Sequence, residues 1–421
     1  MGQLLSKTPN DKEHQDYFSS FEYFKNLHVE NKFISQETIS VIELHLKKGD
    51  IQGANAVITA ALKEINSTQL NIAVTGESGA GKSSLINALR EVKHDSQDAA
   101  PIGVTETTMK RQPYTHPKFP NVTWWDLPGI GTTNFKPEDY LKEVQFAEYD
   151  FFIIVSATRF KESEIELAKV IRRMKKNFYF VRTKVDSDIR NEKKTKPSTF
   201  NKKAVLQKIR NNCLDTFKKN GMIEPQVFLI SSNNLSKYDF QILINTLLKD
   251  IPVQKQHVFM LSLPSVTEAA IERKRESQKK YIWLEAFKSG LLATLPAVGM
   301  MSVEDMKKLK ATLNDFQDLF GVDDLSLKSL AENLQVPMEK LKAKMKSPNL
   351  LEMNNEKTLM EKLLEYVEKF CSVNGGLLAT GLYFRKIFYL QLHFLDTVAG
   401  DAKIILKESI TCSATGLAQQ H

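Results

Sequence analysis

A glycine-rich segment, Gly76-Glu-Ser-Gly-Ala-Gly-Lys-Ser83, carries the clearest chemistry in the chain. It directly follows the apolar run Leu70–Thr75 and leads into Ser84–Arg90, which has helical spacing. The order strand, GxxxxGK[ST], helix is typical of a loop that wraps the phosphates of a nucleotide. Glycines let backbone N–H groups approach phosphate oxygens, and the start of the following helix adds its positive dipole end.

Two side chains of this loop are candidates for catalysis. We expect Lys82 to bridge the β- and γ-phosphates and the Ser83 hydroxyl to bind Mg²⁺. The other loop residues expected to contact the nucleotide are Gly79, Ala80, Gly81 and Ser84. A glycine-rich turn could match the pattern by chance, but the flanking strand and helix argue against that alternative.

A second motif, Asp126-Leu-Pro-Gly129, ends the apolar run Val122–Trp125. An aspartate at the end of a strand suits water-mediated contact with Mg²⁺, and the Gly129 amide can then sense the γ-phosphate. Alone, DxPG is a common turn; after a phosphate loop it predicts a nucleotide switch. The segment between the two motifs should supply a threonine for Mg²⁺, and spacing does not choose between Thr105, Thr107 and Thr108.

A third motif, Thr183-Lys184-Val-Asp186, follows the apolar run Phe178–Arg182. It matches the [NT]KxD signature, in which a carboxylate accepts two N–H groups of guanine while the lysine stem lies along the base. Adenine would leave that carboxylate unpaired, which costs several kcal/mol, or about 10³-fold in affinity. The sequence therefore predicts GTP rather than ATP as the nucleotide. Further contacts with the nucleotide are expected from Gly103, Ser187, Ser231 and Ser232.

One expected residue is absent. Many small GTPases place a glutamine directly after the DxxG glycine to orient the attacking water, and this chain has Ile130 there. We therefore expect slow hydrolysis by the isolated chain and a water-positioning group supplied from elsewhere, such as a second molecule.

The elements that position these motifs fall into three zones of the 421 residues. Residues 1–68 form a polar leader followed by helical spacing, with Ser35 as a helix N-cap. Residues 69–252 alternate short apolar runs with helical segments, which predicts an α/β domain with a mostly parallel sheet. Residues 253–421 lack strand patterns and predict a helical domain.

Composition narrows the partners. Lysine and arginine exceed aspartate and glutamate by 58 to 50, but the basic residues are dispersed and no basic stripe is interleaved with aromatics, so we expect no nucleic-acid partner. Three scattered cysteines form no CxxC pair, which favours a reducing cytosol. No apolar run is long enough to cross a bilayer, so any membrane contact should be peripheral.

The combination of motifs resembles the immunity-related GTPases, the interferon-inducible p47 GTPases of vertebrates. The resemblance rests on the phosphate loop, on Trp125–Phe135, on Glu148–Ile154 and on Phe178–Asp188, and it matches the subgroup with a GKS lysine. It implies a Ras-like GTPase domain inserted between amino- and carboxyl-terminal helical parts, a dynamin-like arrangement. It also implies that Thr108 binds Mg²⁺ and that Glu106 contributes to catalysis across a dimer. A solvated loop glutamate is the alternative for Glu106.

The cellular expectations come from the same resemblance. It implies binding of GTP and GDP, GTP-dependent self-assembly through the GTPase domains, cooperative hydrolysis, and association with related GTPases in defence against pathogens in vacuoles. The implied location is the cytoplasm and, peripherally, the membranes of the endoplasmic reticulum, Golgi and pathogen vacuole. Met1-Gly2-Gln-Leu-Leu-Ser6 fits the myristoylation pattern, with Gly2 as the acylated residue. The aromatic-rich helix expected over Gly381–Leu395 is either core of the helical domain or a membrane-inserting segment.

Two rival interpretations remain from the residues alone. A ribosome-associated GTPase is compatible with the net charge of +8, although no RNA-binding module is evident after residue 253. The other is a scaffold that binds nucleotide without hydrolysing it, and the intact Lys82, Ser83 and Asp126 argue against it.

Overall fold

The computed structural model describes residue 21 and residues 33–103, 110–130, 136–222, 225–292, 303–350 and 382–418. The chain divides into two compact units. The α/β unit comprises Thr68–Pro264, and the helical unit comprises Met1–Ser67 together with Ser265–His421.

A six-stranded sheet forms the centre of the α/β unit, in the strand order β2-β3-β1-β4-β5-β6. Strands β1, β3, β4, β5 and β6 run parallel, and β2 pairs antiparallel with β3 at the edge. The strands are β1 (Leu70–Gly76), β2 (Gln112–Thr115), β3 (Val122–Asp126), β4 (Phe151–Ser156), β5 (Asn177–Arg182) and β6 (Val227–Leu229). All six residues of β4 are buried, as expected for a strand covered on both faces. The predicted α/β fold with a mostly parallel sheet is confirmed.

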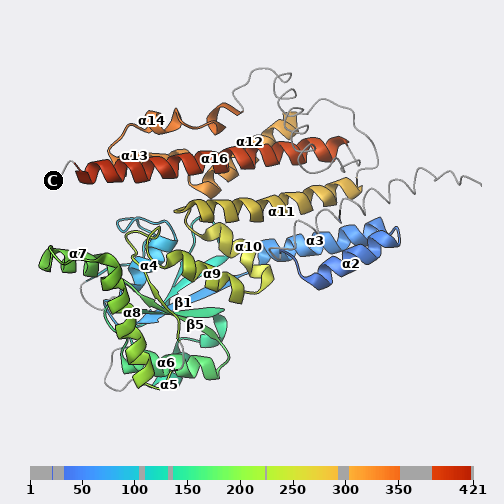
Figure 1. Cartoon of the computed structure of the whole chain (residues 1–421). Coiled ribbons are helices and arrows are strands. Elements are labelled where there is room, and N and C mark those ends of the chain that lie inside the picture. Colours follow the sequence, from blue (N-terminus) through green and yellow to red (C-terminus); the bar gives the residue numbers. More distant parts are fainter. Residues whose placement is uncertain are drawn as a thin grey trace, which may run out of the picture. The chain divides into compact units, whose positions relative to one another are not determined.

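Helices lie around this sheet (Figure 1). They are α4 (Lys82–Leu89), α5 (Pro137–Glu143), η1 (Phe146–Glu148), α6 (Glu162–Arg173), α7 (Val185–Thr195), α8 (Lys202–Lys219), α9 (Phe240–Asp250) and α10 (Val253–Ser262). Phe160, Phe180 on β5 and Phe217 on α8 pack with ring centroids 4.4 to 5.1 Å apart. Each of these rings is at most 1% exposed, so this aromatic cluster joins helix to sheet.

Helix α10 lies with the α/β unit, whereas the sequence pattern placed residues from 253 onward in the helical domain. It contacts β1 and β3. The Phe259 ring meets the Phe151 ring edge-on, with centroids 6.3 Å apart, and Lys255 Nζ lies 2.6 Å from an Asp150 carboxylate oxygen. The loss of strand patterns after residue 252 marks the end of the sheet, and one covering helix follows it.

The helical unit is built from both ends of the chain. Its elements are α2 (Gln36–Lys47), α3 (Ile51–Ser67), α11 (Glu268–Leu292), α12 (Val303–Phe320), α13 (Asp324–Leu334), α14 (Met338–Lys342), η2 (Ser347–Leu350) and α16 (Leu382–Ala418). Helix α11 contacts α3 on one side and α16 on another, and α11 and α16 are long helices in Figure 1. Ser35 caps α2 as predicted, because its side chain accepts from the Thr38 amide at 3.1 Å.

Helix α16 includes most of the aromatic-rich segment Gly381–Leu395, which was expected to be either core or membrane-inserting. The side chains of Phe388, Tyr389, Phe394 and Leu395 are at most 1% exposed, which favours a core role for them over membrane insertion. Within the described ranges, no helix is long and apolar enough to span a bilayer.

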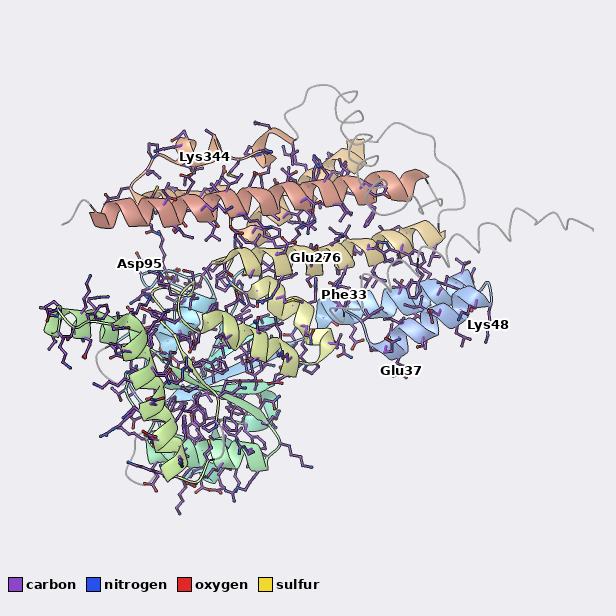
Figure 2. The ribbon with its side chains drawn as sticks, viewed as in Figure 1. Phe33, Glu37, Lys48, Asp95, Glu276 and Lys344 are labelled. Atoms are coloured by element: carbon purple, nitrogen blue, oxygen red, sulfur yellow. The ribbon has the colours of Figure 1, made fainter. Side chains whose placement is uncertain are left out.

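Charged groups hold α16 to its neighbours. Arg275 on α11 bonds to Glu276 at 2.6 Å and to Asp396 on α16 at 2.7 Å. Lys344, just after α14, lies 2.6 Å from Glu408 on α16; Figure 2 labels Glu276 and Lys344. The buried Asp401 carboxylate accepts from the amides of Lys346 and Ser347, the latter at 2.7 Å.

Candidate nucleotide-binding site

The strand register brings the three motifs to one edge of the sheet. Gly76 at the end of β1 lies opposite Val155, and Ser156 at the end of β4 lies opposite Arg182 at the end of β5. Asp126 ends β3 opposite Val74. The loops that follow β1, β3 and β5 therefore start together at the carboxyl ends of the strands, where open parallel sheets bind their ligands.

The phosphate loop begins at a residue that must be glycine. Gly76 has φ +138°, and a Cβ built there would lie 2.0 Å from the Val155 carbonyl oxygen. Gly81, with φ +89°, caps α4 at its N-terminus. The chain thus turns sharply after β1 and enters α4 with its first amides facing the loop, the arrangement that favours an anion.

Lys82 and Ser83 lie where α4 begins. The buried Lys82 ammonium donates to the carbonyl oxygens of Gly76 and Glu77, both at 3.1 Å. The Ser83 hydroxyl donates to Asp126 Oδ2 at 2.6 Å, so residues from the first and second motifs meet directly. A hydroxyl beside a buried carboxylate provides the oxygen ligands that Mg²⁺ prefers, and such a site relies on nucleotide oxygens to complete the coordination. The residues present therefore fit the predicted ion.

The third motif is bonded to the first. Thr183 Oγ1 donates to the Ala80 carbonyl at 2.6 Å, and Lys184 Nζ donates to the Gly79 carbonyl at 2.9 Å. The lysine stem lies next to the phosphate loop, and Lys184 takes a left-handed backbone conformation with φ +57°. The base-reading and phosphate-binding segments are thereby held at a fixed separation.

Asp186 is prepared to act as an acceptor. Burial alone would raise its pKa, but the nearby Ser231 and Asn233 side chains and backbone amides hold the pKa below its ordinary value. Asn233 Nδ2 donates to Asp186 Oδ2 at 3.1 Å. The carboxylate is therefore ionised at neutral pH, as guanine N–H groups require. The Val185 amide bonds to the Ile230 carbonyl, which brings Ser231 and Ser232 beside the motif.

A family comparison identifies the chain. The model of the interferon-inducible GTPase family matches residues 35–409. The chain belongs to the interferon-inducible GTPase family. It is 49% identical to mouse "Interferon-inducible GTPase 1", with 97% of this chain and 99% of the relative covered, and 48% identical to mouse "Interferon-gamma-inducible GTPase 10", with 97% and 98% covered.

Members of this family are GTP hydrolases, and the chain is accordingly a GTPase of interferon-induced immunity. Among solved structures, Aquifex aeolicus Era matches 43% of this chain and 56% of its own, at 20% identity. The TM-score of that match is 0.29, too low to add to the argument.

Three residues that help to hold this GTPase's site together were not predicted from the sequence. Tyr140 on α5 donates its hydroxyl to the Pro128 carbonyl at 3.0 Å and bonds to Thr75 Oγ1 at 2.7 Å. The buried Arg182 bonds to Asp188 at 2.6 Å and to the Thr183 carbonyl. The third residue is Asn233, which bonds to Asp186. It is the one of the three that the sequence could have suggested, because it directly follows Ser231 and Ser232.

Ile130 points into the core. Its side chain is fully buried in a cluster that includes Ala73, Tyr140 and Leu141. The glycine before it, Gly129, is half-buried at the start of the switch. The position that carries glutamine in many small GTPases is thus occupied here by a packing residue.

The remaining predicted residues lie near or beyond the described ranges. Gly103 is exposed at the end of a described segment. Asn87 on α4 fixes the approach to it, because its amide bonds to both the N–H and the carbonyl of Ala100, at 2.7 and 2.8 Å. Gly2, Glu106 and Thr108 lie outside the described residues, as do Thr105 and Thr107.

Proposed function

We propose that this GTPase binds GTP and GDP with Mg²⁺ at the carboxyl edge of its sheet. One observation carries the proposal most directly: Ser83 meets Asp126, while Thr183 and Lys184 bond to the phosphate loop. Three sequence motifs that are far apart in the chain therefore form one surface with an anion-binding end and an ionised base reader.

The residues take distinct roles in hydrolysis. Lys82 and the first amides of α4 hold the phosphates and offset the charge that develops as water attacks the γ-phosphate. Ser83, Asp126 and Thr108 would hold Mg²⁺, which neutralises phosphate charge when bound. The Gly129 amide contacts the γ-phosphate, and Asp186 accepts two N–H groups of the guanine.

The base reader gives the sharpest test of this site. Asp186→Asn should shift preference from guanosine toward xanthosine nucleotides, because xanthine presents a carbonyl where guanine has its amino group. Competition between the two triphosphates for a fluorescent diphosphate would measure the change. Comparable affinities for ATP and GTP in the unmodified chain would refute the assignment.

We further propose that hydrolysis is completed by self-association through the α/β units, with Glu106 contributing across the dimer. The apolar, buried Ile130 supports this, because it cannot hold the attacking water. Specific activity should rise with protein concentration and then reach a plateau, and Glu106→Ala should flatten the rise while nucleotide still binds. Activity per molecule that stays constant from nanomolar to tens of micromolar protein would exclude the dimer.

The cellular part of the proposal is assembly with related GTPases on intracellular membranes and vacuoles that contain pathogens, from a cytoplasmic pool. The endoplasmic reticulum and Golgi are the other proposed membranes. Family membership supports an immune role, and the myristoylation pattern at Gly2 supports peripheral attachment. Gly2→Ala should lower the membrane-bound fraction of the protein in mammalian cells without changing GTP turnover. An unmodified amino terminus in mass spectra of the cellular protein would exclude acylation.

A further inference from the structure

Glu77, which follows Gly76 in the phosphate loop, has neighbours at its carbonyl, its side chain and its backbone amide. The Glu77 carbonyl accepts from Lys82 Nζ, and the Glu77 carboxylate pairs with Lys161 Nζ at 2.7 Å. The Glu77 backbone amide faces Glu164, in the first turn of α6. None of the nucleotide motifs includes Lys161 or Glu164.

Glu164 is an unusual neighbour for a phosphate-binding loop. It is fully buried, and its Oε2 accepts from the Lys161 amide at 2.9 Å. Its other oxygen, Oε1, has no hydrogen-bond partner in the described part of the chain, although the Glu77 amide lies near enough to lower the pKa of the carboxyl. The carboxylate therefore accepts one hydrogen bond, from the amide of Lys161 just before α6, and its second oxygen lies near the Glu77 amide of the phosphate loop without being bonded to it.

The two donors require a particular form of the side chain. An ionised carboxylate offers an acceptor to each amide. A protonated carboxyl, or a glutamine, keeps one acceptor and directs a donor at the other amide. Oε2 already accepts from the Lys161 amide, so the added proton or the glutamine NH₂ group takes the place of Oε1. That donor then faces the Glu77 N–H group and pushes the Glu77 peptide away. That peptide carries one of the two carbonyl groups that Lys82 contacts.

We propose that Glu164 is a positioning residue for the phosphate loop, which acts through Glu77 and Lys161 to hold the loop in the form that binds nucleotide. The inference builds on the proposed nucleotide site and adds a group remote from its motifs. Glu164 touches no reacting atom in this scheme. It sets where Glu77, and with it the Lys82 ammonium, lies.

The ionisation of Glu164 falls within the physiological range. Burial raises its pKa to about 7, with the Glu77 charge acting in the same direction and the amides of Lys161 and Glu77 opposing them. Lys161 and Glu77 are the charged groups that face it, and Cys213 faces it from α8. Burial raises the pKa of the Cys213 thiol to about 11, so that thiol stays neutral near pH 7. Nucleotide affinity should therefore depend on pH through Glu164.

Two simpler roles for Glu164 predict different results. A residue that only caps α6 would affect stability and leave nucleotide affinity unchanged. A residue that acts only as a negative charge near the phosphates would weaken binding when ionised, so removal of its charge would strengthen binding. If Glu164 positions the loop, removal of its charge should instead weaken nucleotide binding.

The test compares Glu164→Gln with the unmodified full-length chain at pH 6, 7 and 8. The measured quantities are the Kd of a fluorescent GDP analogue and the KM and kcat for GTP. At pH 8 we expect the variant to raise Kd and KM by about tenfold with kcat little changed, because the glutamine amide repels the Glu77 N–H group that the native carboxylate attracts. At pH 6 the ratio of the two Kd values should approach one, because the native carboxyl is then protonated as well.

Glu162→Gln is the matched control. It removes the same charge from the same turn of α6, but Glu162 is exposed. Its Kd ratio should be near one at all three pH values. A Glu164→Gln ratio at or below one at pH 8 would overturn the proposal. A native chain that binds no guanine nucleotide at any pH would instead refute the proposed function itself.

Lys161→Ala provides a second route if Glu164→Gln does not fold. The Lys161 side chain is 58% exposed, so its removal should be tolerated. It frees the Glu77 carboxylate and leaves the buried carboxylate of Glu164 in place. We expect a several-fold rise in Kd at pH 8, and an unchanged Kd would contradict the role of this contact.

Discussion

At the scale of single residues, the Tyr140 hydroxyl connects two functional segments. It bonds to Thr75 at the end of β1 and to the Pro128 carbonyl in the second motif. Burial raises its pKa, so the hydroxyl keeps its proton and remains a donor to Pro128 at any physiological pH. The peptide that follows this carbonyl belongs to Gly129, the proposed sensor of the γ-phosphate.

We predict that Tyr140→Phe lowers the affinity for GTP more than the affinity for GDP. The substitution keeps the ring in the core but removes both hydrogen bonds, which should also lower the free energy of unfolding by about 1–3 kcal/mol. Denaturant unfolding and competition binding measure the two effects. Tyr179→Phe is the matched control, because it removes a similar bond, to Asp250 at 2.7 Å, away from the site. An unchanged ratio of GTP to GDP affinity would show that Tyr140 is only structural.

The buried Glu164 should also make folding depend on pH. The ordinary pKa of its carboxyl is 4.5, and the fold raises that pKa to about 7, so the folded state binds more protons than the unfolded chain between these values. The favourable contribution is therefore complete below pH 4.5 and is lost as the pH rises through 7. Relative to Glu164→Gln, the native chain should lose on the order of 3 kcal/mol of unfolding free energy between pH 4.5 and pH 8. Chemical denaturation of both proteins at about pH 5 and pH 8 checks this, and a constant difference would contradict it.

Motif residues could be named from the sequence because each short motif must present a fixed pattern of groups to one rigid ligand. Lys82, Ser83 and Asp126 fall into this class. Tyr140 and Glu164 could not, because each reaches its partner through tertiary packing that leaves no fixed interval in the chain. Asn233 is intermediate, since it directly follows Ser231 and Ser232, which were expected to contact the nucleotide.

At the scale of elements, the site depends on how tightly β1 packs against β4 where the phosphate loop begins. The absence of a side chain at Gly76 lets the two backbones approach there. Both the sheet pairing and the direction of the loop depend on that approach.

We predict that Gly76→Ala prevents stable folding of the α/β unit, because the new methyl group would meet the Val155 carbonyl oxygen at 2.0 Å. Gly221→Ala should cost only about 1–2 kcal/mol, the strain of a left-handed conformation, since nothing lies within 4 Å of its Cβ position. Circular dichroism and GDP binding of the two variants measure the contrast. A folded, nucleotide-binding Gly76→Ala protein would contradict the steric argument.

Sequence patterns identified strands at Leu70–Thr75, Val122–Trp125 and Phe178–Arg182, and all three are present as β1, β3 and β5. They missed β2, a four-residue edge strand in which three residues are exposed and one is half-buried. Such a strand has neither a buried face nor an apolar run, and it contains Pro113, so periodicity does not reveal it. Nor does periodicity show which domain a helix packs against. The sequence pattern therefore placed α10 in the helical domain, whereas the structure places it in the α/β unit.

At the scale of the whole molecule, the chain divides into two compact units. In the helical unit, Asp401 is 1% exposed and serves two backbone donors at the start of η2. It therefore joins η2 to α16 within the helical unit.

We predict that Asp401→Asn lowers the stability of the helical unit by about 2 kcal/mol, because the amide keeps one acceptor and loses the charge. Affinity for GDP should not change. Thermal unfolding and GDP binding provide the two measurements. Asp324→Asn, which affects an exposed ion pair with Lys342, should cost less than about 1 kcal/mol. A loss of GDP affinity in Asp401→Asn would show that the units are coupled energetically.

Helix α3 packs on α11, which is translated much later, so α3 must remain without this partner during much of synthesis. The apolar face of α3, which includes Ile58, Leu62 and Ile65, emerges from the ribosome long before α11 begins at Glu268. At about 5–20 residues per second, the intervening chain of roughly 200 residues takes about 10–40 s to translate. The α/β unit can fold during that interval, whereas α3 must wait for its partner. A nascent chain of this protein therefore presents a helical, apolar surface that suits a ribosome-associated chaperone until the last third of translation.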